Sequence, residues 1–308
     1  MAGRKRKQAE LDERESPVEG GIAGVVGATV LLAAVIVAGF FSWKQWGSAV
    51  IQRSSYQLLA ENVTTPEAPP WIAGDVRGEV FRDASLTDMS VLEDGLTKRI
   101  CDAFEMHPWV ARVNRVNMQP PARIVVDLEY RKPLAWVQVP DGMVPGRRGG
   151  WLPIDKDAVL LPDEGFQEER PELLLLQIDR LLPCGPIGTA WGDPRVAGAA
   201  AIATILGDQW HQLGIARISG VVDYSITSSL PTTRYELLSP NGKRIIWGVA
   251  PSKELPSEPN AIQKLHLLSE FVRRHGPIDN GTALGLDLRN AASVLAPRTA
   301  AQPNTQLR

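Results

Sequence analysis

The chain has 308 residues, of which 44% are hydrophobic and 22% are charged, and its formal net charge at pH 7 is −2. This length suits one membrane segment and two modest domains, and the near-neutral charge predicts no general attraction to nucleic acid. The two cysteines, Cys101 and Cys184, form no CxxC pair, which excludes a disulfide-stapled scaffold and a zinc-thiolate site. We expect two buried free thiols, with a bridge between them as the alternative outside the cytoplasm.

A membrane anchor is predicted at residues 21–43, where no side chain is charged. As a helix this stretch reaches about 35 Å, and a bilayer core is about 30 Å thick. Arginine and lysine are more frequent before it than directly after it, so residues 1–20 are expected in the cytoplasm and everything after residue 44 outside. A cleaved signal peptide is the alternative, but the apolar run is too long and no small-x-small cleavage site follows.

Residues 44–70 are predicted to form a juxtamembrane linker that ends in a stiff, proline-rich spacer. Residues 71–139 then predict a small α+β module in which one sheet carries a helix on its apolar face. The pair His107-Pro108 should end that helix, because a residue before proline avoids the α region. The expected elements are a strand at 76–81, a helix capped by Thr87 or Asp88 with the stripe Leu92, Leu96, Ile100, Ala103 and Phe104, and strands at 113–118, 123–130 and 134–139.

Residues 140–297 predict a second domain, a β domain of antiparallel or mixed sheet with flanking helices, and residues 298–308 a disordered tail. Asp193-Pro194 is a helix start, and Asn241-Gly242 is a strong hairpin signal. The expected strands are 151–154 and 158–161 around a turn at 155–157, then 173–178, 215–223, 233–239, 244–248, 284–289 and 293–295. A second helix follows Pro259, with Ile262, Leu265, Leu268 and Val272 on one side.

Several short motifs follow one another from the end of the first predicted helix to the last predicted strands. They are His107-Pro108-Trp109-Val110, residues 121–126, residues 129–135, residues 151–155, Asn241-Gly242, Trp247-Gly248, Gln263-Lys264-Leu265 and Leu286-Asp287-Leu288-Arg289. In this order, behind one N-terminal anchor, they resemble the FtsQ/DivIB family, the bitopic cell-division proteins of bacteria. The resemblance extends from the anchor to about Pro297.

The resemblance implies a POTRA domain at 71–139, an FtsQ-type β domain at 140–297, and a location in the cell membrane at the division septum. It also implies a non-enzymatic scaffold that links FtsB/FtsL-type partners to septal peptidoglycan synthesis, with a partner strand added at the C-terminal sheet edge. No cofactor, metal or small-molecule substrate is implied. Asn290 departs from the family, in which an aromatic residue usually follows the Asp-Leu-Arg triplet. The implied contact residues are Arg289, Asn290, Ser293, Val294 and Leu295.

Two other functions stay open. One is a POTRA-bearing secretion or outer-membrane assembly factor, although no barrel-length series of strands follows the first module. The other is a membrane-tethered cell-wall enzyme, although the sequence has no GxSxG, HExxH, P-loop or serine–lysine signature.

For several polar residues, a purely structural role is weighed against a functional one. His107 is expected to be a helix-end histidine rather than a ligand or base, and Asp155 with Asp157 a solvated turn rather than a calcium site. Lys264 is expected on the polar side of its helix, either as a solvated charge or with its stem packed against the sheet. Arg147-Arg148 is expected in an exposed loop.

Overall fold

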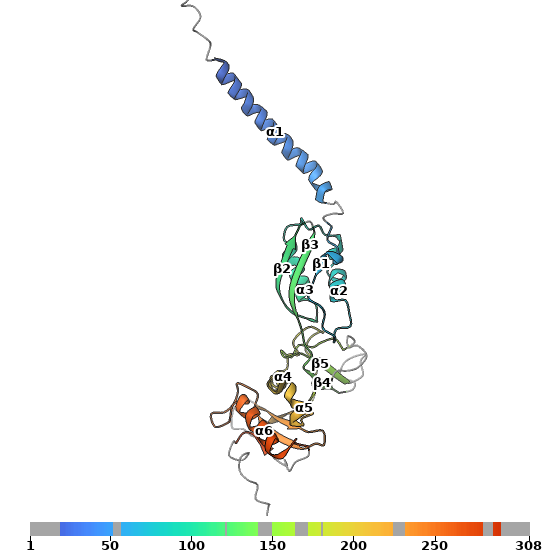
Figure 1. Cartoon of the computed structure of the whole chain (residues 1–308), viewed down its shortest axis with the longest axis vertical. Helices are drawn as coiled ribbons and strands as arrows, with labels where there is room; N and C mark the ends of the chain where they lie inside the picture. The colour runs from blue at the N-terminus through green and yellow to red at the C-terminus, as the bar shows by residue number, and fades with distance from the viewer. Residues whose placement is uncertain are drawn as a thin grey trace, which may run out of the picture.

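The computed structural model describes residues 19–51, 57–120, 122–140, 150–163, 172–179, 181–223, 232–279 and 286–290. It contains one long N-terminal helix, a three-stranded sheet and a seven-stranded sheet. Figure 1 shows the helix apart from the two sheets, each of which carries helices of its own. The predicted α+β class, with a mixed sheet, is confirmed.

The N-terminal helix α1 spans Glu19–Ile51. Its segment Gly24–Gln45 is long and apolar enough to cross a membrane, and none of it is buried against the rest of the chain. A continuous helix satisfies its own backbone hydrogen bonds, which is the condition for lying in hydrocarbon. The helix runs past the predicted segment into the expected linker.

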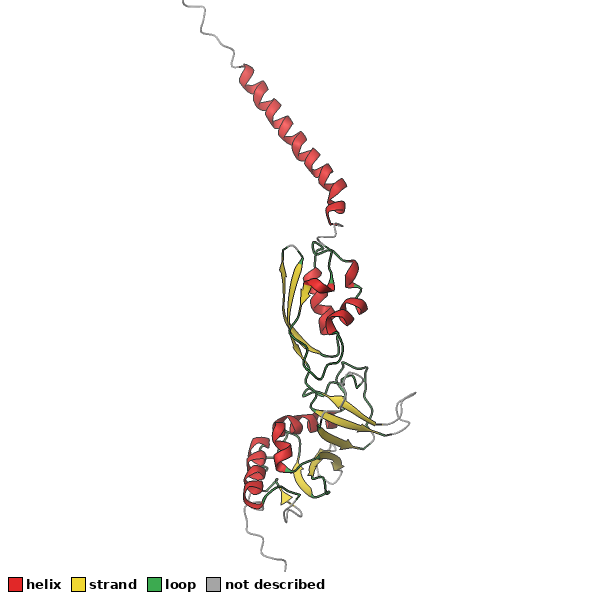
Figure 2. Cartoon of the chain, turned by 45° about the vertical axis from the view of Figure 1, so that its right-hand side comes forward, coloured by secondary structure: helices red, strands yellow, loops and turns green. Residues whose placement is uncertain are grey.

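The first folded module has the chain order strand, helix, helix, strand, strand. Its strands are β1 (Val63–Thr64), β2 (Val110–Gln119) and β3 (Arg123–Tyr130), in the spatial order β1-β3-β2. β1 runs parallel to β3, and β2 runs antiparallel to it. Figure 2 shows the helices on one face of these strands. They are α2 (Val76–Asp83) and α3 (Leu96–Glu105), with the short 3-10 turns η2 (Ala60–Asn62) and η3 (Leu86–Asp88) beside them.

Two predictions for these helices are wrong. Residues 76–81 form the helix α2 instead of a strand, because Val76 and Val80 lie one turn apart and bury the same face. Thr87 and Asp88 belong to a 3-10 turn, and α3 begins only after Gly95, so Leu92 is outside the helix and 49% exposed. The remaining stripe of Leu96, Ile100 and Phe104 is buried, and the helix ends before His107-Pro108 as predicted.

The limits of the first sheet also differ from the prediction. Leu58 and Val63 fall in the expected linker but are fully buried, and Val63 pairs with Ile124 in β3. The predicted third strand at 134–139 forms β4 (Ala135–Val139), which belongs to the seven-stranded sheet. Both differences have one cause: strand partners are chosen by contacts distant in sequence, which local alternation does not encode.

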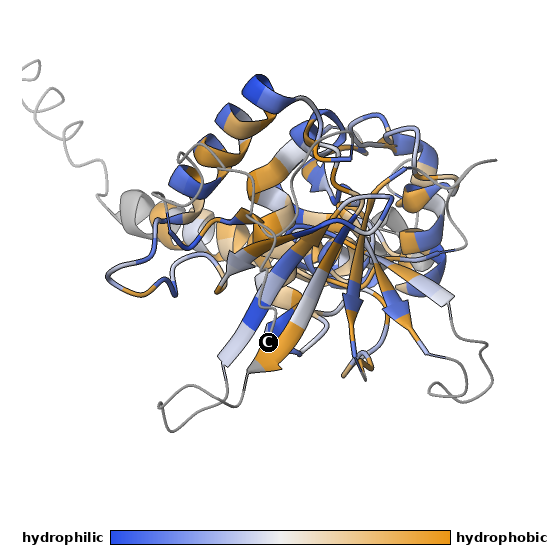
Figure 3. Ribbon diagram, turned by 90° about the horizontal axis from the view of Figure 1, so that it is seen from below, coloured by the Kyte–Doolittle hydropathy of each residue, from blue (hydrophilic) through white to orange (hydrophobic). Residues whose placement is uncertain are grey.

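The second module is built on a sheet with the order β10-β9-β8-β7-β6-β4-β5. β4, β6 and β7 run parallel to one another, as do β9 and β10, and the other neighbours are antiparallel. Figure 3 shows helices gathered on one side of the strands. The remaining elements are β5 (Gly150–Ile154), β6 (Leu174–Ile178), α4 (Pro194–Leu206), the 3-10 turn η4 (Gly207–Gln209), α5 (Trp210–Leu213), β7 (Arg217–Asp223), β8 (Thr232–Leu238), β9 (Arg244–Gly248), α6 (Ala261–His275) and β10 (Leu286–Asp287).

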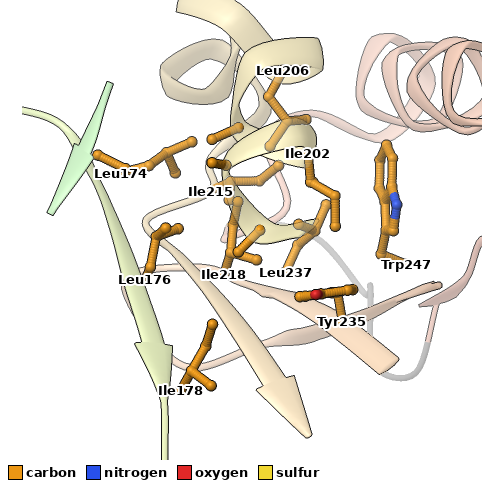
Figure 4. Packing of buried hydrophobic residues seen from close by; sticks show 14 of the residues in the cluster. Leu174, Leu176, Ile178, Ile202, Leu206, Ile215, Ile218, Tyr235, Leu237 and Trp247 are labelled. Atoms are coloured by element: carbon orange, nitrogen blue, oxygen red, sulfur yellow. The ribbon is translucent and has the colours of Figure 1, made fainter. Parts of the chain in front are cut away.

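The core of this module lies between the sheet and the helices α4 and α6. Figure 4 shows Leu176 of β6 and Ile218 of β7 directed toward Ile202 of α4, with Trp247 of β9 on the far side. The predicted central position of the 173–178 strand is confirmed, since β6 has β4 on one side and β7 on the other.

Local signals in this half were reliable. Asp193 caps α4, where its side chain accepts a hydrogen bond from the Arg195 amide at 2.8 Å. Asn241 and Gly242 join β8 to β9 as an antiparallel hairpin. Both cysteines are free as predicted, but only Cys101 is part-buried, and Cys184 is exposed. The predictions for Arg147-Arg148 and for residues 298–308 lie outside the described residues.

Candidate protein-binding edge

The sequence predicts a docking edge at Arg289, Asn290, Ser293, Val294 and Leu295. The structure describes the first two, which follow directly after β10, whereas the other three lie outside the described residues. The site is therefore built from β10, its neighbour β9 and the segment that supports both strands.

β10 is the outermost strand at one end of the seven-stranded sheet. Leu286 pairs with Ile245 and Asp287 with Ile246, and the Leu288 amide donates to the Ile246 carbonyl at 2.9 Å. Within the part of the chain that the structure describes, β9 is the one strand paired with β10. β10 therefore lies at the edge of the described sheet, and a sheet edge is where a strand from another chain can add by backbone pairing.

Side chains along β10 alternate between the core and the outer face of the sheet. Leu286 and Leu288 are 7% and 0% exposed and belong to the core, whereas Asp287 and Arg289 are only partly buried. This alternation follows from strand geometry, in which successive side chains point to opposite faces. The core leucines fix the register, so the charged pair stands on the face away from the helices.

Arg289 and Asp287 form a two-pronged ion pair at the end of β10. Arg289 Nε lies 2.9 Å from Asp287 Oδ1, its Nη2 lies 2.7 Å from Oδ2, and its backbone amide donates to Oδ1 at 3.0 Å. Burial acts to raise the pKa of Asp287, but the hydrogen bonds from Arg289 outweigh it and leave that pKa below its ordinary value. The guanidinium is thus held in one orientation at the end of β10.

Gly248, at the end of β9, allows this arrangement. Its φ is +98°, and a Cβ at this position would lie 2.9 Å from Arg289 Cγ and would clash with Glu258 Oε1. Only glycine combines the positive φ with the space that both side chains occupy. The Trp247-Gly248 pair singled out from the sequence therefore has a steric role at the edge.

A buried ion pair lies directly behind this glycine. Lys264 Nζ is 2.6 Å from Glu258 Oε1, and the two side chains are 0% and 5% exposed. The same carboxylate oxygen accepts a hydrogen bond from the Val249 amide at 3.3 Å, and the ammonium lies 5.4 Å from the centre of the Trp247 ring. This pair links α6 to the end of β9 and so supports the edge strand.

The prediction that Lys264 lies on the polar side of its helix is wrong. The buried face of α6 consists of Ala261, Lys264, Leu268 and Phe271, while Ile262 is 66% exposed. Lys264 is three residues after Ala261 and four before Leu268, so helical spacing already placed it on this face. The sequence did not reveal which residue pairs with Lys264, because its partner Glu258 lies in the loop before the helix.

The predicted solvated turn at Asp155 and Asp157 is also partly wrong. Asp155 is 2% exposed, lies 2.6 Å from Arg131 Nη1 through its Oδ2, and accepts hydrogen bonds from the amides of Asp157 and Val159 through its Oδ1. Arg131 directly follows β3, so the pair connects the two modules. Asp157 is exposed and paired with Lys156, as expected of a surface turn.

His107 is 9% exposed, and its Nε2 lies 3.0 Å from Glu79 Oε2 on α2. Its Nδ1 accepts a hydrogen bond from the Trp109 amide at 3.3 Å, so the ring joins the end of α3 to α2 and β2. These contacts give the histidine a structural position. Among the described residues, no group of three or more His, Cys, Asp or Glu side chains could hold a metal ion.

No protein-family model matches this chain, and a search of curated proteins found no match either. The candidate edge therefore stands on its geometry: the outermost of the described strands, an oriented arginine just after it and a buried ion pair behind it.

Proposed function

We propose that this chain is a membrane-anchored, non-enzymatic scaffold of the FtsQ/DivIB type. It binds FtsB/FtsL-type division proteins outside the cytoplasm and links them to septal peptidoglycan synthesis. Its binding mode is strand addition at the C-terminal sheet edge, with Arg289, Asn290, Ser293, Val294 and Leu295 at the contact. The observation that carries the proposal is the position of β10 at the end of the described sheet.

Two features of the chain support this proposal. The apolar helix α1 is long enough to hold the folded modules at a membrane. The first module is a small α+β unit with helices on one face of its three-stranded sheet, which suits the POTRA domain of the proposed family.

The partner would recognise the edge by backbone pairing and by charge. Strand addition at a sheet edge uses backbone pairing, and a carboxylate on the added strand contacts the Arg289 guanidinium, whose side chain is 36% exposed. Asn290 provides an amide where an aromatic anchor was expected, so hydrogen bonding replaces part of the apolar burial at this position.

The test is capture of partners from membranes of the source cell by the tagged full-length chain. We expect a small bitopic protein with a coiled-coil sequence to co-purify with the wild type, and Val294→Asp to reduce its capture at least about tenfold. Val221→Asp is the matched control, because Val221 is 50% exposed on β7, away from the edge. If Val294→Asp and Val221→Asp captured equal amounts of the partner, the C-terminal contact residues would not be part of the interface.

Position in the cell gives a second, independent test. A fluorescent fusion should concentrate at the septum of dividing cells. Uniform envelope fluorescence throughout the cell cycle would contradict the assignment to the division machinery.

A second candidate function is favoured by β2. This strand is ten residues long, pairs with β3 alone among the described strands, and has mostly exposed side chains. A long open edge suits the transient binding of unfolded strands in a secretion or assembly factor. Co-purification with a β-barrel protein, lost when β2 is interrupted by Asn114→Pro, would favour this function over the first.

A further inference from the structure

A groove lies where the two modules meet, and tryptophan side chains line one end of it. Trp136 of β4, Trp151 of β5 and Trp210 of α5 line a cavity of about 320 Å³, together with Leu175 and Ala216. Its size suits a single large side chain rather than a complete cofactor.

Strand geometry explains why two of these indoles gather there. Ala135 and Val137 of β4 point into the core, so Trp136 between them points to the opposite face of the sheet. Trp136 lies opposite Pro153, and Trp151 is two residues before that proline, which places both indoles on the same outer face as diagonal neighbours.

Carboxylates dominate the other end of the groove. A second cavity of about 400 Å³ shares Glu172, Leu173 and Trp210 with the first and is lined by residues of both modules. The Glu172 side chain is 82% exposed, and its Oε1 lies 4.0 Å from His211 Nδ1. The His211 ring is stacked on Trp210, with ring centres 3.4 Å apart. Across this second cavity, the carboxylates are Glu129, Asp155, Asp157, Glu172 and Asp208, and the permanent cations are Arg131, Lys132 and Lys156.

Three of these carboxylates already have a cationic partner. Asp155 is paired with Arg131, Asp157 with Lys156, and Glu129 with Arg112 outside the groove. The charges that remain are Glu172 and Asp208 against Lys132, so the excess negative charge lies at the two carboxylates, on the side of the cavity that Trp210 lines. An indole face carries negative electrostatic potential, so the aromatic end and the acidic end attract the same kind of group.

We propose that this groove binds a basic segment of a partner protein, with one arginine or lysine side chain inserted among Trp136, Trp151 and Trp210. A neighbouring basic residue of the same segment faces Glu172 and Asp208. This interface is separate from the strand-addition edge, because β5 and β10 lie at opposite ends of the sheet. The two proposals can therefore fail independently.

The test uses the full-length chain in non-ionic detergent micelles and a fluorescently labelled peptide of alternating arginine and glycine. A peptide in which citrulline replaces arginine is the control for shape, because citrulline keeps the length and the planar end group of arginine without the charge. Fluorescence anisotropy measures both dissociation constants. We expect the arginine peptide to bind about tenfold more tightly than the citrulline peptide.

Variants then locate the binding. The double variant Glu172→Gln and Asp208→Asn should weaken binding of the arginine peptide about tenfold, and Trp151→Leu about threefold or more. The control is Glu61→Gln with Glu105→Gln, which removes the same charge from exposed positions on the first module. Near-ultraviolet circular dichroism checks that each variant is folded.

Three outcomes would overturn the proposal. They are equal loss of affinity in the two charge variants, equal binding of the arginine and citrulline peptides, and unchanged binding by Trp151→Leu in a folded protein. If chitotetraose displaced the labelled peptide while citrulline bound as well as arginine, the groove would be a carbohydrate site instead.

Discussion

Lys264 Nζ lies 2.6 Å from Glu258 Oε1, and neither side chain has more than 5% of its surface exposed. Burying two charges costs desolvation free energy. The pair offsets this cost through the attraction between the two charges and through further polar contacts nearby. The Val249 amide is one of these contacts and ties the ion pair to the end of β9. The position of the edge strands thus depends on a charge pair inside the domain.

Removal of one charge of this pair should lower the free energy of unfolding much more than removal of both. Lys264→Met leaves the Glu258 carboxylate buried without its cation and should lower the free energy of unfolding by about 3–5 kcal/mol. The double variant with Glu258→Gln should recover much of that loss. Denaturant titration followed by circular dichroism measures both. Lys98→Met, at a side chain that is 81% exposed, is the control and should leave the denaturation midpoint unchanged.

Gly248→Ala should destabilise the edge more than the same change in the β8–β9 hairpin. Both Gly248 and Gly242 have positive φ, but a Cβ at Gly242 meets nothing within 4 Å, whereas one at Gly248 meets Glu258 and Arg289. We expect a loss of about 1 kcal/mol for Gly242→Ala and about 1–3 kcal/mol more for Gly248→Ala. Thermal and denaturant unfolding measure the stability of both variants. If Gly248→Ala and Gly242→Ala lost similar amounts of stability, the space beside Gly248 would not be critical.

The Asp287 carboxyl should titrate below its ordinary pKa of about 3.9, because Arg289 stabilises the charged form. The stabilisation is therefore present above pH of about 4 and is lost as the pH falls through the lower folded-state pKa. Arg289→Gln should raise the Asp287 pKa, since burial then acts without its cation. Carbon NMR titration of the aspartate carboxyls measures the change. Arg244→Gln, whose partner is Glu236, should leave the Asp287 midpoint in place.

The contact between the modules should depend on Asp155. Asp155→Ala removes the carboxylate from Arg131, whose side chain is 15% exposed, and leaves the amides of Asp157 and Val159 without their acceptor. We expect a loss of about 3–5 kcal/mol in unfolding free energy. Hydrogen exchange should also quicken at residues 153–161. Asp157→Asn affects an exposed pair and should stay within about 0.5 kcal/mol of the wild type.

Predictions from short local motifs of the sequence were the most reliable ones. The uncharged run before Trp43, the Asp193-Pro194 start and the Asn241-Gly242 turn each act within a few residues, and each forms the expected element. The strand predicted at 76–81 is wrong because a segment of six residues with only three apolar side chains is too short to fix a period, and burial of Val76 with Val80 decided for the helix.

The candidate site was only partly accessible to such reasoning. Leu286 and Asp287 were expected in a strand and form one, but the partners that orient Arg289 and neutralise Lys264 were not identified. Glu258 was assigned no role because it lies in a loop whose path depends on the whole domain. The tryptophan groove was also missed, since its members come from β4, β5 and α5.

By itself, the sequence determined the membrane-length helix, the α+β class, most of the strands and the Asp193 cap, because these depend on periodicity and on contacts within one or two turns. Only the tertiary structure decided that β1 pairs with β3, that β4 joins the larger sheet, and that Asp155 and Lys264 are buried with partners. These features depend on which distant segments meet. A charged residue is solvated or buried according to a partner that its own neighbours in sequence do not specify.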